Sequence, residues 1–416
     1  MQILPPSATR DARWLVAART LRSLGDGLTS VLLPAFLLAL GHSELEVGVL
    51  STAALIGSAA LTLAVGLAAH RLAPRRVLLA ASVLLLLTGF GFAVSSAFAV
   101  LLLVAFVGTL NPSGGDVSVF LPTEQAMLAE TVEPSERTAL FARYNVCAGL
   151  AVALGALTAG LPAWLGARTG ADLADAARFA FAGYGLLGIA TALCYRRLAG
   201  ATREPDAVRK REHTAALPRR ALGESRGIVL RLTALFSLDS FGGGFAINAI
   251  LVLWLLQRHA LSLEAASVAM SAAALLSALS QLASAPLARR IGLIRTMVFT
   301  HLPANAFLIG AAFAPDAGAA VACLLARAAL SQMDVPARQA YVMSVVRPEE
   351  RAAAASVTNV PRSLAAAVSP SLAGAMLGAS SFGWPLVAGG ALKIVYDLLL
   401  LAGFRHRPAR EERLEQ

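Results

Sequence analysis

Apolar stretches of about 18 residues or more recur about twelve times along the chain. Each is long enough to cross a hydrocarbon core of about 30 Å as an α-helix. The stretches span residues 14–40, 45–69, 77–97, 98–130, 138–165, 178–198, 228–256, 264–288, 295–313, 317–346, 350–378 and 383–404. Because a bilayer admits only helices and closed barrels, we predict an all-α membrane protein with 12 transmembrane helices.

The composition agrees with this fold class and excludes a large soluble enzyme. Of 416 residues, 57% are hydrophobic and only 14% are charged, and the mean hydropathy is +0.68. The sequence contains no P-loop, HExxH or GxSxG motif, so neither a nucleotide-driven pump nor a hydrolase is indicated, and no cofactor is expected. Cys147, Cys194 and Cys323 stand alone in apolar segments, which argues against a disulfide or a metal site.

Arginine is distributed unevenly between the connections. The residues that follow or surround the ends of predicted helices 2, 4, 8 and 10 are Arg71, Arg75, Arg76, Arg137, Arg289, Arg290, Arg295, Arg347 and Arg351. The connections after helices 1, 3, 9 and 11 contain no Arg or Lys. Three arginines on the predicted outer side, Arg168, Arg178 and Arg258, are exceptions to this uneven distribution. Since Arg-rich short loops stay in the cytoplasm, we predict a multi-pass protein of a bacterial inner membrane with both termini cytoplasmic. No cleaved signal peptide is expected, because MQILPPSATRDAR lacks an h-region and a cleavage site.

A basic segment divides the chain and accounts for much of its net charge of +10. It predicts an N-terminal six-helix half at 1–198, a cytoplasmic linker at 199–227 and a C-terminal six-helix half at 228–416. No aromatic residues alternate with its charges, so nucleic acid is not an expected partner. Anionic membrane lipid is the expected neighbour of this linker.

The two halves repeat each other in sequence. GLAAHRLAPRR from Gly66 matches APLARRIGLIR from Ala285 at an offset of 285 − 66 = 219, which pairs Arg71 with Arg290 and Arg76 with Arg295. A second match has an offset of 336 − 122 = 214 and pairs Pro122, Gln125, Pro134, Glu136, Arg137 and Asn145 with Pro336, Gln339, Pro348, Glu350, Arg351 and Asn359. Such spacing is typical of a transporter built from two parallel repeats.

Two six-helix repeats joined by a basic linker resemble the major facilitator superfamily, over essentially the whole chain. GLAAHRLAPRR is similar to that superfamily's loop after helix 2, with His70 where Asp is usual and Ala73 where Gly is usual. Gly66, Arg75 and Gly292 are further candidate residues of these conformational loops. The resemblance implies a monomeric secondary transporter of a small molecule, in the style of bacterial proton-coupled efflux proteins, whose helices 1, 4, 7 and 10 line a central cavity.

Candidate charged residues near the middle of apolar stretches fall on those four helices. They are Asp26 in helix 1, Asp116 in helix 4, Asp239 in helix 7, and Arg327 and Asp334 in helix 10. An intramembrane charge costs several kcal/mol unless it faces a cavity or a partner, so these residues mark a polar pathway. Around Asp116, NPSGGD predicts either a broken, cavity-facing segment or a simple proline kink.

Asp26 and Asp239 occupy corresponding, glycine-flanked places in the two halves, and are candidates to carry protons through the transport cycle. The alternative is structural pairing with Arg19, Arg22 or Arg327. In helix 12, Lys393 and Asp397 are expected to pair with each other at i,i+4 spacing. His301, in helix 9, is expected to be a satisfied interior group rather than a proton relay.

Glu124 and Arg338 occupy the same place in the two repeats, since 338 − 124 = 214, but have opposite charge. They predict a cytoplasmic gate that closes when the two residues meet. Equally, each residue has a candidate partner in its own half, Arg143 for Glu124 and Asp334 for Arg338.

The direction of transport is indicated only by partial motifs. Helix 4 lacks the Arg of drug–proton antiporters, a similar pattern RAALSQ lies in helix 10, and GALTAGLP and SPSLAG only partly match the exporter motif. These features favour export. An importer or uniporter of the same fold and a non-transporting receptor are the alternatives.

Overall fold

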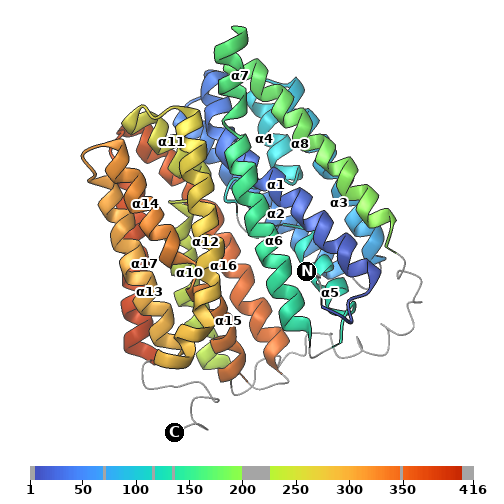
Figure 1. Cartoon of the computed structure of the whole chain (residues 1–416). Helices are drawn as coiled ribbons and strands as arrows, with labels where there is room; N and C mark the ends of the chain where they lie inside the picture. The colour runs from blue at the N-terminus through green and yellow to red at the C-terminus, as the bar shows by residue number, and fades with distance from the viewer. Residues whose placement is uncertain are drawn as a thin grey trace. The chain divides into compact units, whose positions relative to one another are not determined.

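The computed structural model describes residues 5–68, 72–114, 118–133, 136–198, 225–346 and 350–404, and the regular elements in these ranges are helices (Figure 1). The first six predicted spans correspond to α1 (Arg10–Ala39), α2 (Glu44–Ala68), α3 (Pro74–Val94), α4 (Phe98–Val107), α5 (Leu121–Ala129), α6 (Arg137–Thr158), α7 (Leu161–Thr169) and α8 (Leu173–Arg196). The last six correspond to α10 (Arg226–Gly244), α11 (Asn248–His259), α12 (Leu263–Ile291), α13 (Leu293–Ala312), α14 (Ala317–Ser331), α15 (Asp334–Val345), α16 (Arg351–Ala379) and α17 (Trp384–Phe404).

Nine segments of the described chain are helical, long and apolar enough to cross a membrane, and three of them run through a short interruption. Helices α13 and α16, and the interrupted pair α4 and α5, complete the twelve. The predicted fold class, an all-α membrane protein with two parallel six-helix repeats, is therefore confirmed.

The stretch predicted as one span at 98–130 is divided into α4 and α5. Between them, Pro112 has no N–H to donate and Gly114 has a φ of +65°, a left-handed conformation that favours glycine. The carbonyl of Pro112 accepts a hydrogen bond from the backbone N–H of Ala249 in α11, at 3.1 Å. Irregular backbone at membrane depth is thus satisfied by protein, which is the condition for its being tolerated there. Residues 115–117, which include Asp116, lie outside the described ranges.

Glycine permits close helix packing in the first six spans. A Cβ atom on Gly27 of α1 would lie 2.1 Å from the carbonyl oxygen of Val152, and one on Gly155 of α6 would lie 1.9 Å from that of Leu24. Each helix therefore presents a glycine to the backbone of the other, and no larger residue fits without moving α1 from α6. Helix α1 also packs against α8.

Helix α10 packs closely against α16 in a similar way. A Cβ atom on Gly244 would lie 2.4 Å from the carbonyl oxygen of Ala366. Pro361 of α16 cannot donate to the carbonyl of Val357, four residues before it, and the hydroxyl of Thr233 in α10 lies 3.3 Å from that oxygen. The part of α16 around Pro361 is thereby linked to α10, which carries Asp239.

Exposed apolar side chains follow helical stripes, as expected for surfaces that face lipid. On α3 the stripe consists of Val83, Leu87, Phe90 and Val94, spaced by three or four residues. Buried aromatic rings fill the interior instead, among them Phe236, Tyr341 and Tyr396 in the core of the last six spans.

The helices group by their contacts into two compact units. One contains residues 1–209 and 247–275, and the other contains residues 210–246 and 276–416. Helix α11 belongs to the first unit because it packs against α1 and α2, where Gln257 donates to Glu44 at 3.0 Å. These two units are defined by contacts between helices. The halves 1–198 and 228–416 are defined by the sequence repeat, and that domain division remains a prediction.

Candidate functional site

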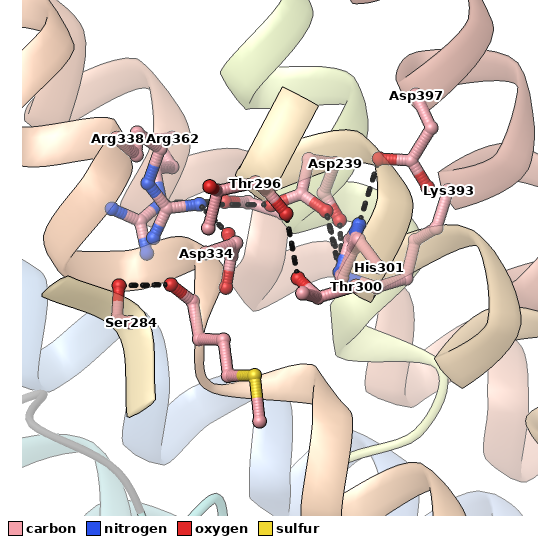
Figure 2. Close-up of polar contacts among 12 residues, drawn as sticks. Asp239, Ser284, Thr296, Thr300, His301, Asp334, Arg338, Arg362, Lys393 and Asp397 are labelled. Atoms are coloured by element: carbon pink, nitrogen blue, oxygen red, sulfur yellow. Dashed lines mark hydrogen bonds and ion pairs between the residues drawn. The ribbon is translucent and has the colours of Figure 1, made fainter. Parts of the chain in front are cut away.

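Asp239 is the centre of a buried network of charged side chains in the second unit (Figure 2). Its Oδ1 accepts a hydrogen bond from Nζ of Lys393 at 2.7 Å, and its Oδ2 accepts one from Nη1 of Arg338 at 3.2 Å. Nε2 of His301 lies 3.8 Å from Oδ1. One carboxylate of α10 thus contacts bases from α13, α15 and α17.

The helical period explains how these groups come together. His301 and Asn305 of α13 are one turn apart, as are Asp334 and Arg338 of α15, so each pair lies on one face of its helix. A Cβ atom on Gly242 of α10 would lie 2.9 Å from Cγ of Lys393. Glycine at position 242 therefore leaves room for the lysine chain to reach Asp239.

The network extends in two directions from Asp239. On one side Nη1 of Arg338 also lies 3.2 Å from Oδ2 of Asp334. On the other side Nδ1 of His301 lies 2.9 Å from Oδ1 of Asp397, whose Oδ2 accepts a bond from Nδ2 of Asn305 at 3.1 Å. Arg338 is held by two carboxylates, whereas Asp397 is held by a histidine and an amide.

The charges of the network nearly balance. Asp239, Asp334 and Asp397 face Arg338 and Lys393, and all five side chains are at most 10% exposed. His301 adds a positive charge only in its protonated form. A buried charge is costly unless a counter-charge lies close to it in good geometry. Gaining or losing one proton in this network therefore changes which of its ion pairs are stable.

Lys393 and Asp397 were expected to pair with each other, but the structure gives them different partners. Lys393 contacts Asp239, and Asp397 contacts His301 and Asn305. The expectation that His301 is a satisfied interior group is confirmed, since it is 3% exposed and hydrogen-bonded. Residues far apart in sequence supply these partners, which is why i,i+4 spacing alone was misleading.

Glu124 is the centre of a second buried cluster, in the first unit. Its carboxylate forms an ion pair with Arg22 and accepts hydrogen bonds from the hydroxyls of Tyr144, at 2.7 Å, and Tyr195. Nη1 of Arg22 also donates to Ser118 at 3.2 Å. The sequence suggested Arg143 as the partner within this half, and the structure pairs Glu124 with Arg22 of α1.

The other predicted intramembrane charges lie on α1, α14 and α15. Asp26 lies in α1, one turn after Arg22, and is 7% exposed. Arg327 lies in α14, and its Nε is buried without a hydrogen-bond partner among the described residues. Arg338 was paired with Asp334 as an alternative to the gate, and that pair is present.

The repeated loop residues Glu136 and Glu350 make corresponding contacts. Glu136 accepts a hydrogen bond from the backbone N–H of Ser7 at 3.1 Å, just before α1, and Glu350 accepts one from that of Ser225 at 3.3 Å, at the start of α10. Each glutamate therefore fixes the entrance to the first helix of its half. The contact is electrostatically favourable, because a carboxylate sits near a helix N-terminus.

The remaining loop residues are mostly at the surface. Arg137 donates to the carbonyl of Ala129 at 2.9 Å, and Arg75 donates to that of Tyr195 at 3.2 Å. Gly292 adopts a φ of +86° before α13, a conformation that favours glycine. Arg76, Arg290 and Arg295 are exposed, and no atom lies near a Cβ built on Gly66. Arg71 and the side chain of Arg351 lie outside what the structure describes.

Comparisons with known proteins bear on this architecture. A sequence model described as Major Facilitator Superfamily matches residues 15–332. The uncharacterized membrane protein YJR124C of Saccharomyces cerevisiae is 26% identical over an alignment 425 residues long. The alignment covers 95% of this chain and 94% of that protein.

Solved transporter structures share the fold. The nucleoside transporter NupG aligns with a TM-score of 0.71 at 14% identity, covering 96% of this chain and 100% of that one. The inward open xylose transporter XylE of E. coli aligns with a TM-score of 0.73 at 16% identity, covering 97% and 99%. A bacterial homolog of the human lysosomal transporter Spinster gives 0.73 at 14% identity, covering 96% and 97%. At these identities the likeness concerns the fold.

Proposed function

The chain belongs to the major facilitator superfamily and is a multi-pass membrane transporter rather than an enzyme, and on that premise we propose proton-coupled export of a small molecule by alternating access. Protons and the substrate are its proposed partners, and the working unit is a monomer. Alternating access requires two states whose relative stability responds to the bound ligands.

The observation that carries the proposal is the arrangement around Asp239. This carboxylate contacts Lys393, Arg338 and His301, which lie on three other helices. Protonation of Asp239 would remove the negative charge that holds these bases together. The bases would then repel one another or accept other anions, and the packing of α10 against its neighbours would change. Asp239 is therefore the proposed proton carrier of the second half.

Asp26 is the proposed counterpart in the first half. It occupies the repeat position of Asp239, since 239 − 26 = 213, and lies in α1 beside the buried Arg22. Asp116, Asp334 and Arg327 are proposed to line the polar pathway.

Export is proposed over import on the partial exporter motifs and on the RAALSQ pattern that contains Arg327 and Gln332. An importer or uniporter of the same fold is the second candidate, and a nucleoside transporter and a xylose transporter are among the proteins that share this fold. The two readings differ in whether expression lowers or raises the amount of a solute in the cell. A receptor would bind a solute and move none.

The proposed placement is a bacterial inner membrane with both termini cytoplasmic, on the basis of the arginine distribution. Reporter fusions after Arg137 and after Arg220 test it. Active alkaline phosphatase at either position contradicts this orientation, because that reporter works only outside the cytoplasm.

A compound-toxicity panel in an efflux-deficient bacterium tests the transport proposal. Cells expressing the chain should tolerate at least one compound better than cells with an empty vector, and a protonophore should abolish the difference. The variant Asp239→Asn should give no protection at equal protein level. Increased toxicity on expression indicates import instead, and protection that survives the protonophore contradicts proton coupling.

A further inference from the structure

Arg362 of α16 is a half-buried arginine whose charge is not matched by a carboxylate (Figure 2). Its Nε donates a hydrogen bond to Oγ of Ser240 in α10 at 2.8 Å. Among the described residues, no acceptor bonds to its two terminal nitrogens, Nη1 and Nη2, and neither nitrogen is a fully buried orphan. The end of the guanidinium is therefore open to a ligand.

The position of Arg362 on its helix directs it away from lipid. The exposed apolar stripe of α16 consists of Val360, Leu364, Val368 and Leu372, spaced by four residues. Arg362 is two residues from both Val360 and Leu364, which is about 200° around a helix of 3.6 residues per turn. It therefore lies on the opposite face, where α16 packs against α10.

The acidic groups nearby are already occupied. Asp239, Asp334 and Arg338 are the charged residues that act on Arg362, and Arg338 repels it. Arg338 contacts both of these carboxylates, and Lys393 takes the other oxygen of Asp239. Arg362 thus adds a positive charge that none of these carboxylates meets in an ion pair.

Arg327 is a further positive charge in the second unit. Its Nε is buried without a hydrogen-bond partner, and no described residue forms an ion pair with it. Among the described residues, and leaving His301 aside, the network and these two arginines together comprise Arg327, Arg338, Arg362 and Lys393 against Asp239, Asp334 and Asp397. Four cations against three carboxylates leave one positive charge at membrane depth, which is costly unless an anion or water meets it.

We infer that Arg362 binds an anionic group, a carboxylate or a phosphate, of the transported molecule. With Nε engaged by Ser240, the parallel N–H groups of Nη1 and Nη2 remain available for a bidentate contact, which is the geometry that carboxylate and phosphate oxygens accept from arginine. Ser240 is a positioning residue that fixes the plane of the guanidinium. This inference rests on the proposed transport function only in taking the bound anion to be the substrate.

The test uses the purified full-length chain in nanodiscs of zwitterionic phosphatidylcholine. Thermal unfolding is followed with benzoate, malate, phenyl phosphate and benzenesulfonate, and with the uncharged benzamide. At least one carboxylate or phosphate probe should raise the unfolding midpoint of the wild type, and benzamide should not. For that probe, Arg362→Gln should weaken binding about tenfold or more, because a charge-assisted hydrogen bond is lost.

Two further variants keep the test decisive. Arg362→Lys retains the charge without the fork and should bind at an intermediate affinity, as should Ser240→Ala. Arg231→Gln, which removes an exposed arginine from α10, is the matched control and should bind like the wild type. If Arg362→Gln fails to fold, the lysine and alanine variants still decide, because equal affinity of both with the wild type contradicts the inference.

Anionic phospholipid is the other source of the same chemistry. Nanodiscs containing phosphatidylglycerol distinguish it: stabilisation by this lipid that Arg362→Gln abolishes, without any effect of the soluble probes, contradicts a substrate site. Stabilisation by no anion of the panel also contradicts it. The assay requires neither a proton gradient nor transport, so anion binding without proton-driven flux leaves this inference standing and contradicts the proposed function.

Discussion

Nη1 of Arg338 lies 3.2 Å from Oδ2 of Asp239, so a buried arginine–carboxylate pair joins the helices that correspond to spans 7 and 10. The first half contains a counterpart, in which Arg22 of α1 pairs with Glu124 of α5. The charges are exchanged between the halves: span 1 carries the arginine, whereas span 7 carries the carboxylate. In each half, an arginine–carboxylate pair joins the first span to the fourth, but the positions of the arginine and the carboxylate are reversed.

Asp239→Asn should strongly destabilise the protein, because Lys393 and Arg338 lose a buried counter-charge. Breaking a buried ion pair by removing one partner costs about 3 to 5 kcal/mol. The unfolding midpoint in detergent should fall, and adding Lys393→Met should recover part of the loss by removing a cation at the same time. A double variant that is less stable than Asp239→Asn contradicts this role for the pair.

Glu124→Gln should destabilise the first unit, because it leaves Arg22 without its buried counter-charge and weakens the hydrogen bonds from two tyrosines. We expect a loss of about 3 kcal/mol, again seen in the unfolding midpoint. Glu130→Gln changes an exposed residue at the end of the same helix and should lie within about 0.5 kcal/mol of the wild type. Equal midpoints for the two variants contradict the assignment.

Gly155→Ala should destabilise the contact of α6 with α1, since the new Cβ atom would overlap the backbone carbonyl of Leu24. Overpacking of this kind costs about 1 to 3 kcal/mol. Gly183→Ala is the matched control in α8, because no atom lies within 4 Å of its Cβ position. Relieving glycine's entropy there should stabilise the helix by up to about 1 kcal/mol.

The proposed gate between Glu124 and Arg338 predicts non-additive effects. In a cysteine-free background, the alkylation rate of a cysteine placed at the cytoplasmic ends of the helices reports the population of the inward-facing state. Glu124→Gln and Arg338→Gln should each raise it, and the double variant should raise it little further. The expected coupling is about 1 to 3 kcal/mol. Additive effects indicate instead that each residue acts only within its own half.

Sequence reasoning identified the spans and several charged residues because their signals are local. A run of about 20 apolar residues, or a charge within it, is visible without any knowledge of packing. Asp239 and Asp334 were found in this way, Arg338 was found from the sequence repeat, and all three belong to the buried network. The break between α4 and α5 was indicated by Pro112 and the glycines that follow it.

The partners of these charges could not be predicted, because they come from helices distant in sequence. Nothing local links Lys393 or His301 to Asp239, or Arg22 to Glu124. Arg362 was missed although it is a charge inside an apolar stretch, since the expectation was confined to spans 1, 4, 7 and 10. A charge at membrane depth is costly in any span, so a search of all twelve spans for such charges would have found Arg362.

Proton-driven flux in proteoliposomes is the measurement that decides whether Asp239 couples transport to protons. The solute is the compound identified by the toxicity panel, and the control is exchange of labelled for unlabelled solute without a gradient. An imposed pH gradient should drive net flux through the wild type, and Asp239→Asn should lose this flux but retain exchange. Gradient-driven flux that persists in Asp239→Asn, with the same dependence on the gradient as the wild type, would contradict the account.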